Sequence, residues 1–123
     1  MTPVWTVLRV NPYRARATVD GVAVEVWKQD AVRDLPAGYL PGIALTPGTR
    51  SWPNGVRRLL RGRLLSPELV AALAALGDRH ATAADAKRAI EALARAWAAF
   101  APEEARGTLA PDSKTPSQKD EIR

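Results

Sequence analysis

Residues 14–27 read RARATVDGVAVEVW, in which two alternating runs of six residues flank the dipeptide Asp20-Gly21. This dipeptide is a strong signal for a β-hairpin, because a type I′ turn needs a positive φ at both of its central residues. A two-residue turn also fixes the register, so each residue of the first run has a defined partner in the second. The predicted pairs are Val19 with Val22, Arg16 with Glu25, and Arg14 with Trp27.

This register gives the hairpin one apolar face and one polar face. The apolar face consists of Ala15, Ala17, Val19, Val22, Val24 and Val26. The polar face consists of Arg14, Arg16, Thr18, Ala23, Glu25 and Trp27. Neighbours on one face of a strand pair interact, so we expect an ion pair between Arg16 and Glu25 and a cation–π contact between Arg14 and Trp27.

The segments around the hairpin predict a third strand and two helices. Residues 4–10 are rich in β-branched and aromatic side chains, which indicates a strand ended by Asn11-Pro12. Ser66 followed by Pro67 is typical of a helix start, and Gly77 of a helix end. A second helix is predicted from about residue 82 to residue 100, so the C-terminal half should form an αα-hairpin.

The middle of the chain is punctuated by proline and glycine. We expect type II turns at Pro41-Gly42 and Pro47-Gly48, with a short strand over residues 43–46 between them. Residues 56–65 alternate between arginine and leucine pairs, which favours a short basic amphipathic turn or helix but leaves a strand open.

Taken together, these elements predict an α+β fold, in which a small N-terminal antiparallel β-meander packs against the αα-hairpin. Residues 1–102 should form a single domain, since the chain is too short for a second hydrophobic core. Residues 103–123 contain few apolar side chains, so we expect a tail that is disordered or ordered by a partner.

Composition excludes several classes of protein. The 123 residues contain no cysteine, which excludes a disulfide scaffold, thiol chemistry and any zinc site built on cysteine. No apolar run is long enough to cross a bilayer, and the first residues lack the pattern of a signal peptide. We therefore expect a cytoplasmic protein with no membrane partner.

The net charge of +5 is concentrated in one segment. Residues 35–67 contain no acidic side chain, and their five arginines carry a formal charge equal to that of the whole chain. These residues are Arg50, Arg57, Arg58, Arg61 and Arg63. A local excess of one sign matters more than the total charge, because mixed charges within a Debye length of about 10 Å largely cancel.

Catalytic motifs are missing from the sequence. It contains no P-loop, G-x-S-x-G or G-x-G-x-x-G pattern, and its single histidine, His80, cannot form a two-histidine metal site. We expect a non-enzymatic protein with no cofactor, no metal and no small-molecule substrate.

The arginine segment favours a nucleic-acid-binding accessory protein. Arg50, Arg57, Arg58, Arg61 and Arg63 would contact phosphates, and Trp52 would stack on an exposed base. The alternative is a small adaptor or inhibitor that docks on an acidic surface of a larger protein machine, with the same residues and Trp27 as anchors. The sequence leaves the choice between DNA, RNA and protein open.

Overall fold

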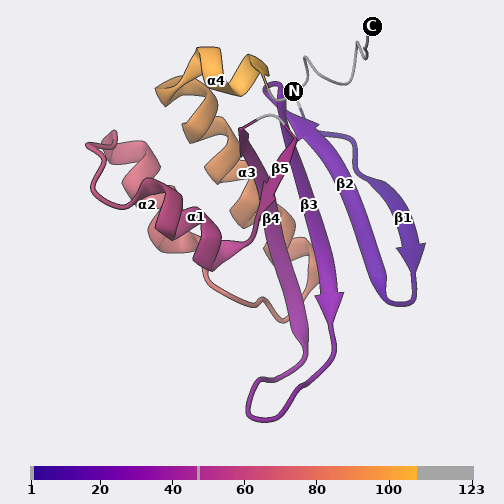
Figure 1. Cartoon of the computed structure of the whole chain (residues 1–123). Coiled ribbons are helices and arrows are strands. Elements are labelled where there is room, and N and C mark those ends of the chain that lie inside the picture. The colour runs from indigo at the N-terminus through magenta and orange to yellow at the C-terminus, as the bar shows by residue number, and fades with distance from the viewer. Residues whose placement is uncertain (1, 47, 108–123) are drawn as a thin grey trace, which may run out of the picture.

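The computed structural model describes residues 2–46 and 48–107. Its five strands form one antiparallel sheet in sequence order, so each strand pairs with the next along the chain (Figure 1). The strands are β1 (Thr6–Val10), β2 (Tyr13–Val19), β3 (Val22–Gln29), β4 (Gly38–Thr46) and β5 (Thr49–Ser51). The predicted N-terminal meander is therefore present and is extended by two further strands.

Four helices follow the sheet in the described part of the chain. They are α1 (Pro53–Leu60), α2 (Pro67–Leu76), α3 (Ala83–Phe100) and α4 (Pro102–Gly107). Helix α3 packs across β2, β3 and β4, and α2 packs on α3 as the predicted αα-hairpin (Figure 1). The α+β fold class is confirmed.

The central hairpin has the predicted register. Val19 pairs with Val22, and Asp20 and Gly21 have φ values of 50° and 83°. The expected ion pair between Arg16 and Glu25 is wrong, however. Arg16 lies directly opposite Glu25 in the register, but the ion pair is made diagonally by Arg14, which also takes Arg14 away from the expected cation–π contact with Trp27.

The core lies between the apolar face of the sheet, called here the inner face, and the helices. The predicted apolar side chains of β2 and β3 are all buried, and so are Ile43 and Leu45 of β4. Helix α3 contributes Ile90, Leu93 and Trp97 to the same cluster. Burial of this surface provides the main driving force for folding.

Local signals place the helix ends. Ser66 Oγ accepts a hydrogen bond from Leu69 N at 3.2 Å, and Thr82 Oγ1 accepts one from Asp85 N at 3.1 Å, as N-cap residues do. The ambiguous segment 56–65 begins as a helix, which ends at Leu60. The chain then turns at Gly62, whose φ is 80°.

The predicted turn at Pro41-Gly42 is wrong, because both residues lie within β4. Alternate residues of a strand direct their backbone groups to the same side. Along the edge of β4 that faces away from β3, the backbone of Tyr39 bonds to His80, and Ile43 pairs with β5. Pro41 lies between these two positions. No described strand pairs with β4 there, so the backbone N–H that proline lacks is not needed.

The second predicted turn lies where expected, since Thr46 pairs with Thr49 and Gly48 has a φ of 75°; Pro47 itself is outside the described residues. The expected tail, residues 103–123, begins within α4. Ala105 of α4 is buried, because this helix packs on α3 and β4, and residues 108–123 lie outside the described part.

No helix within residues 2–46 and 48–107 has the length and apolar character needed to span a bilayer.

Replacing Ile90 by alanine should lower the free energy of unfolding by about 2–5 kcal/mol, because it empties a fully buried position between α3 and the sheet. Val70 is 53% exposed on α2, and its replacement by alanine should change stability by less than about 0.5 kcal/mol. Urea denaturation of both variants compares the two. Equal losses would contradict this placement of the core.

Candidate functional site

The face of the sheet opposite α3, called here the outer face, carries the polar side of the central hairpin. No helix in the described part of the chain packs on this face of β2 and β3, since the helices join the core on the inner face. Strand parity and register place these residues on it: Arg14, Arg16, Glu25, Trp27, Leu40, Gly42, Arg50 and Trp52.

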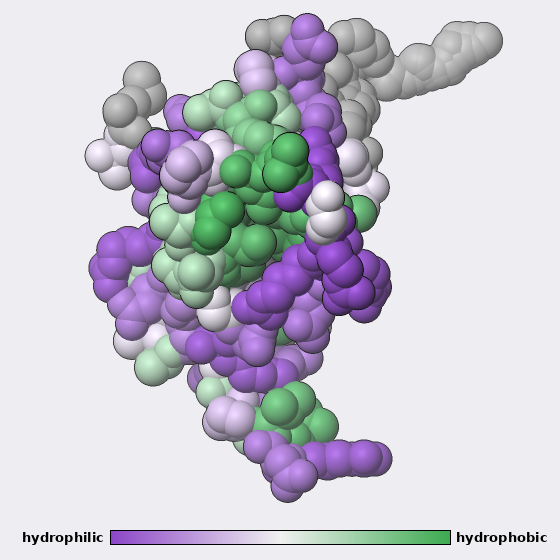
Figure 2. Space-filling view, turned by 90° about the vertical axis from the view of Figure 1, so that its left-hand side faces the viewer, coloured by the Kyte–Doolittle hydropathy of each residue, from purple (hydrophilic) through white to green (hydrophobic). Residues whose placement is uncertain are grey.

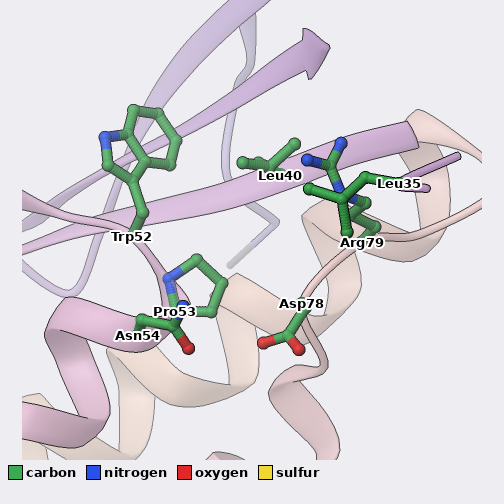
Figure 3. Close-up of a pocket in the computed structure, with 7 residues that line it drawn as sticks. All are labelled: Leu35, Leu40, Trp52, Pro53, Asn54, Asp78 and Arg79. Atoms are coloured by element: carbon green, nitrogen blue, oxygen red, sulfur yellow. The ribbon is translucent and has the colours of Figure 1, made fainter. Parts of the chain in front are cut away.

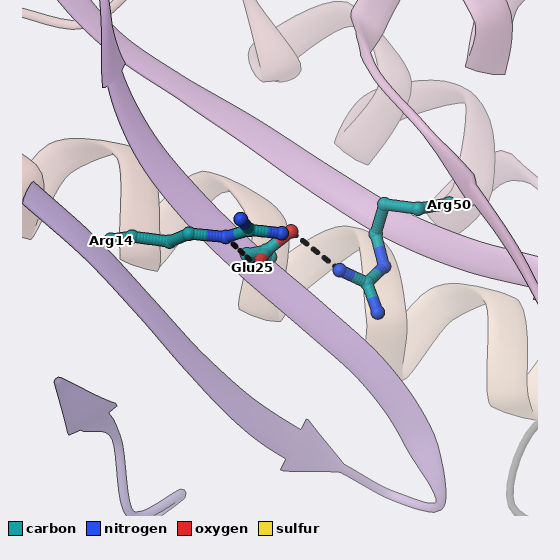
Figure 4. Close-up of polar contacts among 3 residues, drawn as sticks. All are labelled: Arg14, Glu25 and Arg50. Atoms are coloured by element: carbon teal, nitrogen blue, oxygen red, sulfur yellow. Dashed lines mark hydrogen bonds and ion pairs between the residues drawn. The ribbon is translucent and has the colours of Figure 1, made fainter. Parts of the chain in front are cut away.

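Glu25 lies at the centre of the outer face and is 0% exposed. Its carboxylate accepts hydrogen bonds from Arg14 Nε at 2.6 Å and from Arg50 Nη1 at 2.5 Å (Figure 4). A buried carboxylate is tolerated only when it is paired and hydrogen-bonded. The two guanidinium groups meet that requirement and link β2, β3 and β5.

Arg50 reaches Glu25 across β4, as Figure 4 shows. The residues of β4 that lie in the way have little or no side chain. Gly42 is paired with Glu25 in the register, and Ala44 is two residues further along the same face. A larger side chain at either position would occupy the space through which Arg50 extends.

The ion pair also acts on Arg14. The hydrogen bond to Glu25, and then the charge of Glu25, raise the pKa of Arg14 above its ordinary value, although desolvation opposes them. Arg14 therefore stays positively charged at any pH at which the protein would be used. Two positive charges face one negative charge, so the group keeps a net positive charge.

Two tryptophans lie beside this group. The ring centroids of Trp27 and Trp52 are 5.9 Å apart, with an angle of 50° between the ring planes. Trp52 lies against Gly42, where a Cβ atom would come within 2.6 Å of the indole. Both indoles are partly exposed, so they present an aromatic surface on the outer face.

The predicted arginine cluster is divided among several places rather than forming one patch. Arg50 belongs to the outer face, together with Trp52. Arg57 on α1 pairs with Asp78 at 2.6 Å. Arg63 lies over the rings of Trp97 and Phe100 and is 3.8 Å from Glu104.

The remaining two members of the cluster, Arg58 and Arg61, are exposed at the C-terminal end of α1. Neither makes an ion pair with another described residue. Arg58 lies in the last turn of α1 and Arg61 is its C-cap, whereas Trp52 is the N-cap at the opposite end of this helix.

Sequence reasoning missed part of the outer face. The alternating pattern places Arg14, Arg16 and Trp27 on one face, but the net charge of the sequence points instead to residues 50–63. Arg79 could not have been found this way, because it comes from the loop between α2 and α3. Its guanidinium donates to Gln29, and its Cβ lies against Gly38 at the start of β4.

A pocket of about 200 Å³ opens beside Trp52 (Figure 3). It lies beside Leu40 of β4, between the start of α1 and the loop that joins α2 to α3. The lining residues are Leu35, Leu40, Trp52, Pro53, Asn54, Asp78 and Arg79.

A second and more open hollow, of about 650 Å³, lies between α2 and α3. It is lined mostly by alanines, with Glu68 and Arg95 at its rim. Figure 2 looks onto the side where α2 lies and shows apolar surface gathered there.

Comparison with known protein families, curated proteins and solved structures finds no match to this chain. Among the described residues, no group of three histidine or carboxylate side chains is placed to hold a metal ion.

The Glu25→Gln variant should lose about 1–3 kcal/mol of stability, because the neutral amide has one acceptor oxygen for two guanidinium donors and its NH2 group faces the other donor. The loss stays below that of a fully buried pair, since the side chains of Arg14 and Arg50 are 44% and 29% exposed. Glu103→Gln makes the same change at an exposed site and should cost less than about 0.5 kcal/mol. Urea titration measures both, and a neutral Glu25→Gln variant would refute the role of this carboxylate.

Replacing Gly42 by alanine should displace Trp52 and destabilise the protein by about 1–3 kcal/mol, as overpacking does. Gly55 is the matched control, because an added Cβ there meets Ser51 at an ordinary 3.5 Å and alanine favours helix α1. Near-ultraviolet circular dichroism follows the tryptophans, and chemical denaturation follows stability. If both variants kept the parental tryptophan signal, the described contact would be wrong.

Proposed function

We propose that the protein binds single-stranded nucleic acid on the outer face of its sheet, as a non-enzymatic accessory protein of the cytoplasm. One observation carries the proposal. Two neighbouring, partly exposed tryptophans lie on the same face as four arginines, and the carboxylate of Glu25 is fully buried between two of these arginines. The four arginines are Arg14, Arg16, Arg50 and Arg79.

The tryptophans favour single strands over duplexes. Stacking on an indole requires the flat side of an unpaired base, and each stacked base contributes about 1–3 kcal/mol. Trp27 and Trp52 are close enough for two successive bases of one strand to stack on the two indoles. A paired base in a duplex offers only its edge in the grooves.

The arginines favour a polyanion. Arg16 is exposed and makes no ion pair with another described residue, so its guanidinium is available for a phosphate. Arg14 and Arg50 are fixed in direction by Glu25, which lowers the entropy lost when they engage a ligand. Guanidinium groups match phosphate oxygens in geometry as well as in charge.

The alternative, an adaptor for an acidic protein surface, is favoured by a different feature. Strand β1 is an edge strand, and its valines are exposed, with Val10 at 81%. An open edge of this kind accepts an added strand from a partner. The outer face, by contrast, combines the chemistry of base stacking with that of phosphate binding, so nucleic acid is the favoured ligand.

Fluorescence anisotropy with labelled single-stranded and double-stranded DNA and RNA, at about 50 and 200 mM salt, tests the proposal. We expect tighter binding to single strands. Trp27→Ala and Trp52→Ala should each weaken binding by about tenfold or more. Trp5→Ala serves as the control, since Trp5 bonds to Glu91 of α3 rather than lying on the outer face.

The salt dependence identifies the phosphate contacts. Arg16→Ala should lower the slope of log affinity against log salt by about 0.7, which corresponds to one phosphate of a single strand. Arg88→Ala removes an arginine from α3 and should leave the slope unchanged. If only the combined replacement of Arg57, Arg58 and Arg61 abolished binding, the interface would lie on α1, and the outer face would be excluded.

A further inference from the structure

The pocket beside Trp52 has the chemistry of a base-recognition site. We propose that it accepts one unpaired guanine of the bound strand, with Asp78 and Asn54 recognising the edge of the base. This inference rests on the proposed binding of single-stranded nucleic acid and adds a sequence preference to it.

The size of the pocket fits one planar ring system. Sites for drug-sized ligands are about 300–1,000 Å³, whereas this pocket is about 200 Å³. Its walls include Leu35, Leu40 and Pro53, which are apolar, and one edge of the indole of Trp52 (Figure 3). Apolar walls with a few polar groups at one end are typical of sites that bind a flat heterocycle.

Arg57 fixes the polar end. Its Nη1 atom donates to Asp78 Oδ1 at 2.6 Å and to Asn54 Oδ1 at 3.2 Å. With the carbonyl oxygen of Asn54 held in this way, its amide nitrogen remains available as a donor. Asp78 Oδ2 accepts no hydrogen bond from a described residue. Arg57 also neutralises Asp78, which reduces repulsion between that carboxylate and a nearby phosphate.

The pocket therefore offers a carboxylate acceptor beside an amide donor. Guanine presents the complementary pattern on its Watson–Crick edge, where N1–H and the N2 amino group are adjacent donors and O6 is an acceptor. A carboxylate can accept from both donors at once. Adenine and cytosine carry a single amino donor on this edge, and thymine and uracil carry a single N–H between two carbonyl oxygens.

The position of the pocket makes it continuous with the aromatic surface. Trp52 contributes to both, because it lines the pocket and its ring centroid lies 5.9 Å from that of Trp27. A strand whose bases stack on the two tryptophans can therefore place its next base in the pocket. Arg79, at the opposite wall, supplies a positive charge near the phosphate that links them.

The wild-type protein provides the first test. Anisotropy compares three short thymine oligomers. They differ at one central position, which carries guanine, hypoxanthine or adenine. Hypoxanthine lacks only the N2 amino group of guanine. We expect the guanine oligomer to bind about tenfold more tightly than the other two, within the range given by one bidentate contact.

The Asp78→Asn variant provides the second test. It should bring the ratio of guanine to hypoxanthine affinity close to one by weakening the binding of the guanine oligomer. The affinity for the hypoxanthine and adenine oligomers should not fall, because a negative charge is removed. Asp20→Asn makes the same change at the exposed hairpin turn and should keep the ratio of the wild type.

The outcomes separate the two proposals. Equal binding of all three oligomers, with loss of binding in Trp27→Ala, would overturn the guanine site and leave the outer face as the interface. A guanine preference that persists in Asp78→Asn would also overturn this assignment. If no oligomer bound, both the function and the guanine site would be refuted.

Discussion

A carboxylate without solvent contact organises the outer face of this protein. Arg14 and Arg50 pair with the buried carboxylate of Glu25 from strands on either side, and a buried carboxylate is tolerated only when it is paired and hydrogen-bonded. That requirement fixes the direction of both arginines and demands small residues on β4, at Gly42 and Ala44. The same lack of side chains allows Trp52 to lie against the strand and next to Trp27. The charge and the aromatic surface thus have one structural cause.

The two faces of the sheet have different tasks. The inner face is apolar and packs on α3, which provides the burial that a small domain needs. The outer face contributes little to the core, so core packing does not constrain which side chains it carries. The pocket beside Trp52 lies where β4, the start of α1 and the loop from α2 to α3 meet.

Much of the fold could be predicted from local chemistry. The Asp20-Gly21 turn set the register correctly, and Ser66 and Thr82 marked helix starts, because each signal acts over a few residues. The path of β4 could not be predicted, since proline and glycine usually indicate a turn. Only the arrangement of His80 and Ser51 along the edge shows that Pro41 needs no partner there.

The candidate site was predictable only in part, for the same reason. Arg50 and Trp52 were identified, but arginines close in sequence proved to lie on different surfaces. The composition of a segment reports its charge and not the direction of each side chain. Arg14 and Arg79 join the outer face from distant parts of the chain, and pairings of that kind follow from the tertiary fold.

The two edges of the sheet differ in a way that bears on assembly. The outer edge of β4 is occupied by β5 at one end and by His80 at the other, with Pro41 between them, so the sheet cannot grow on that side of β4. Strand β1 remains open to an added strand. A protein that extended the sheet from β1 would leave both tryptophans uncovered. On the proposed function, a polypeptide added at β1 and a nucleic-acid strand on the outer face would occupy the same sheet without competing.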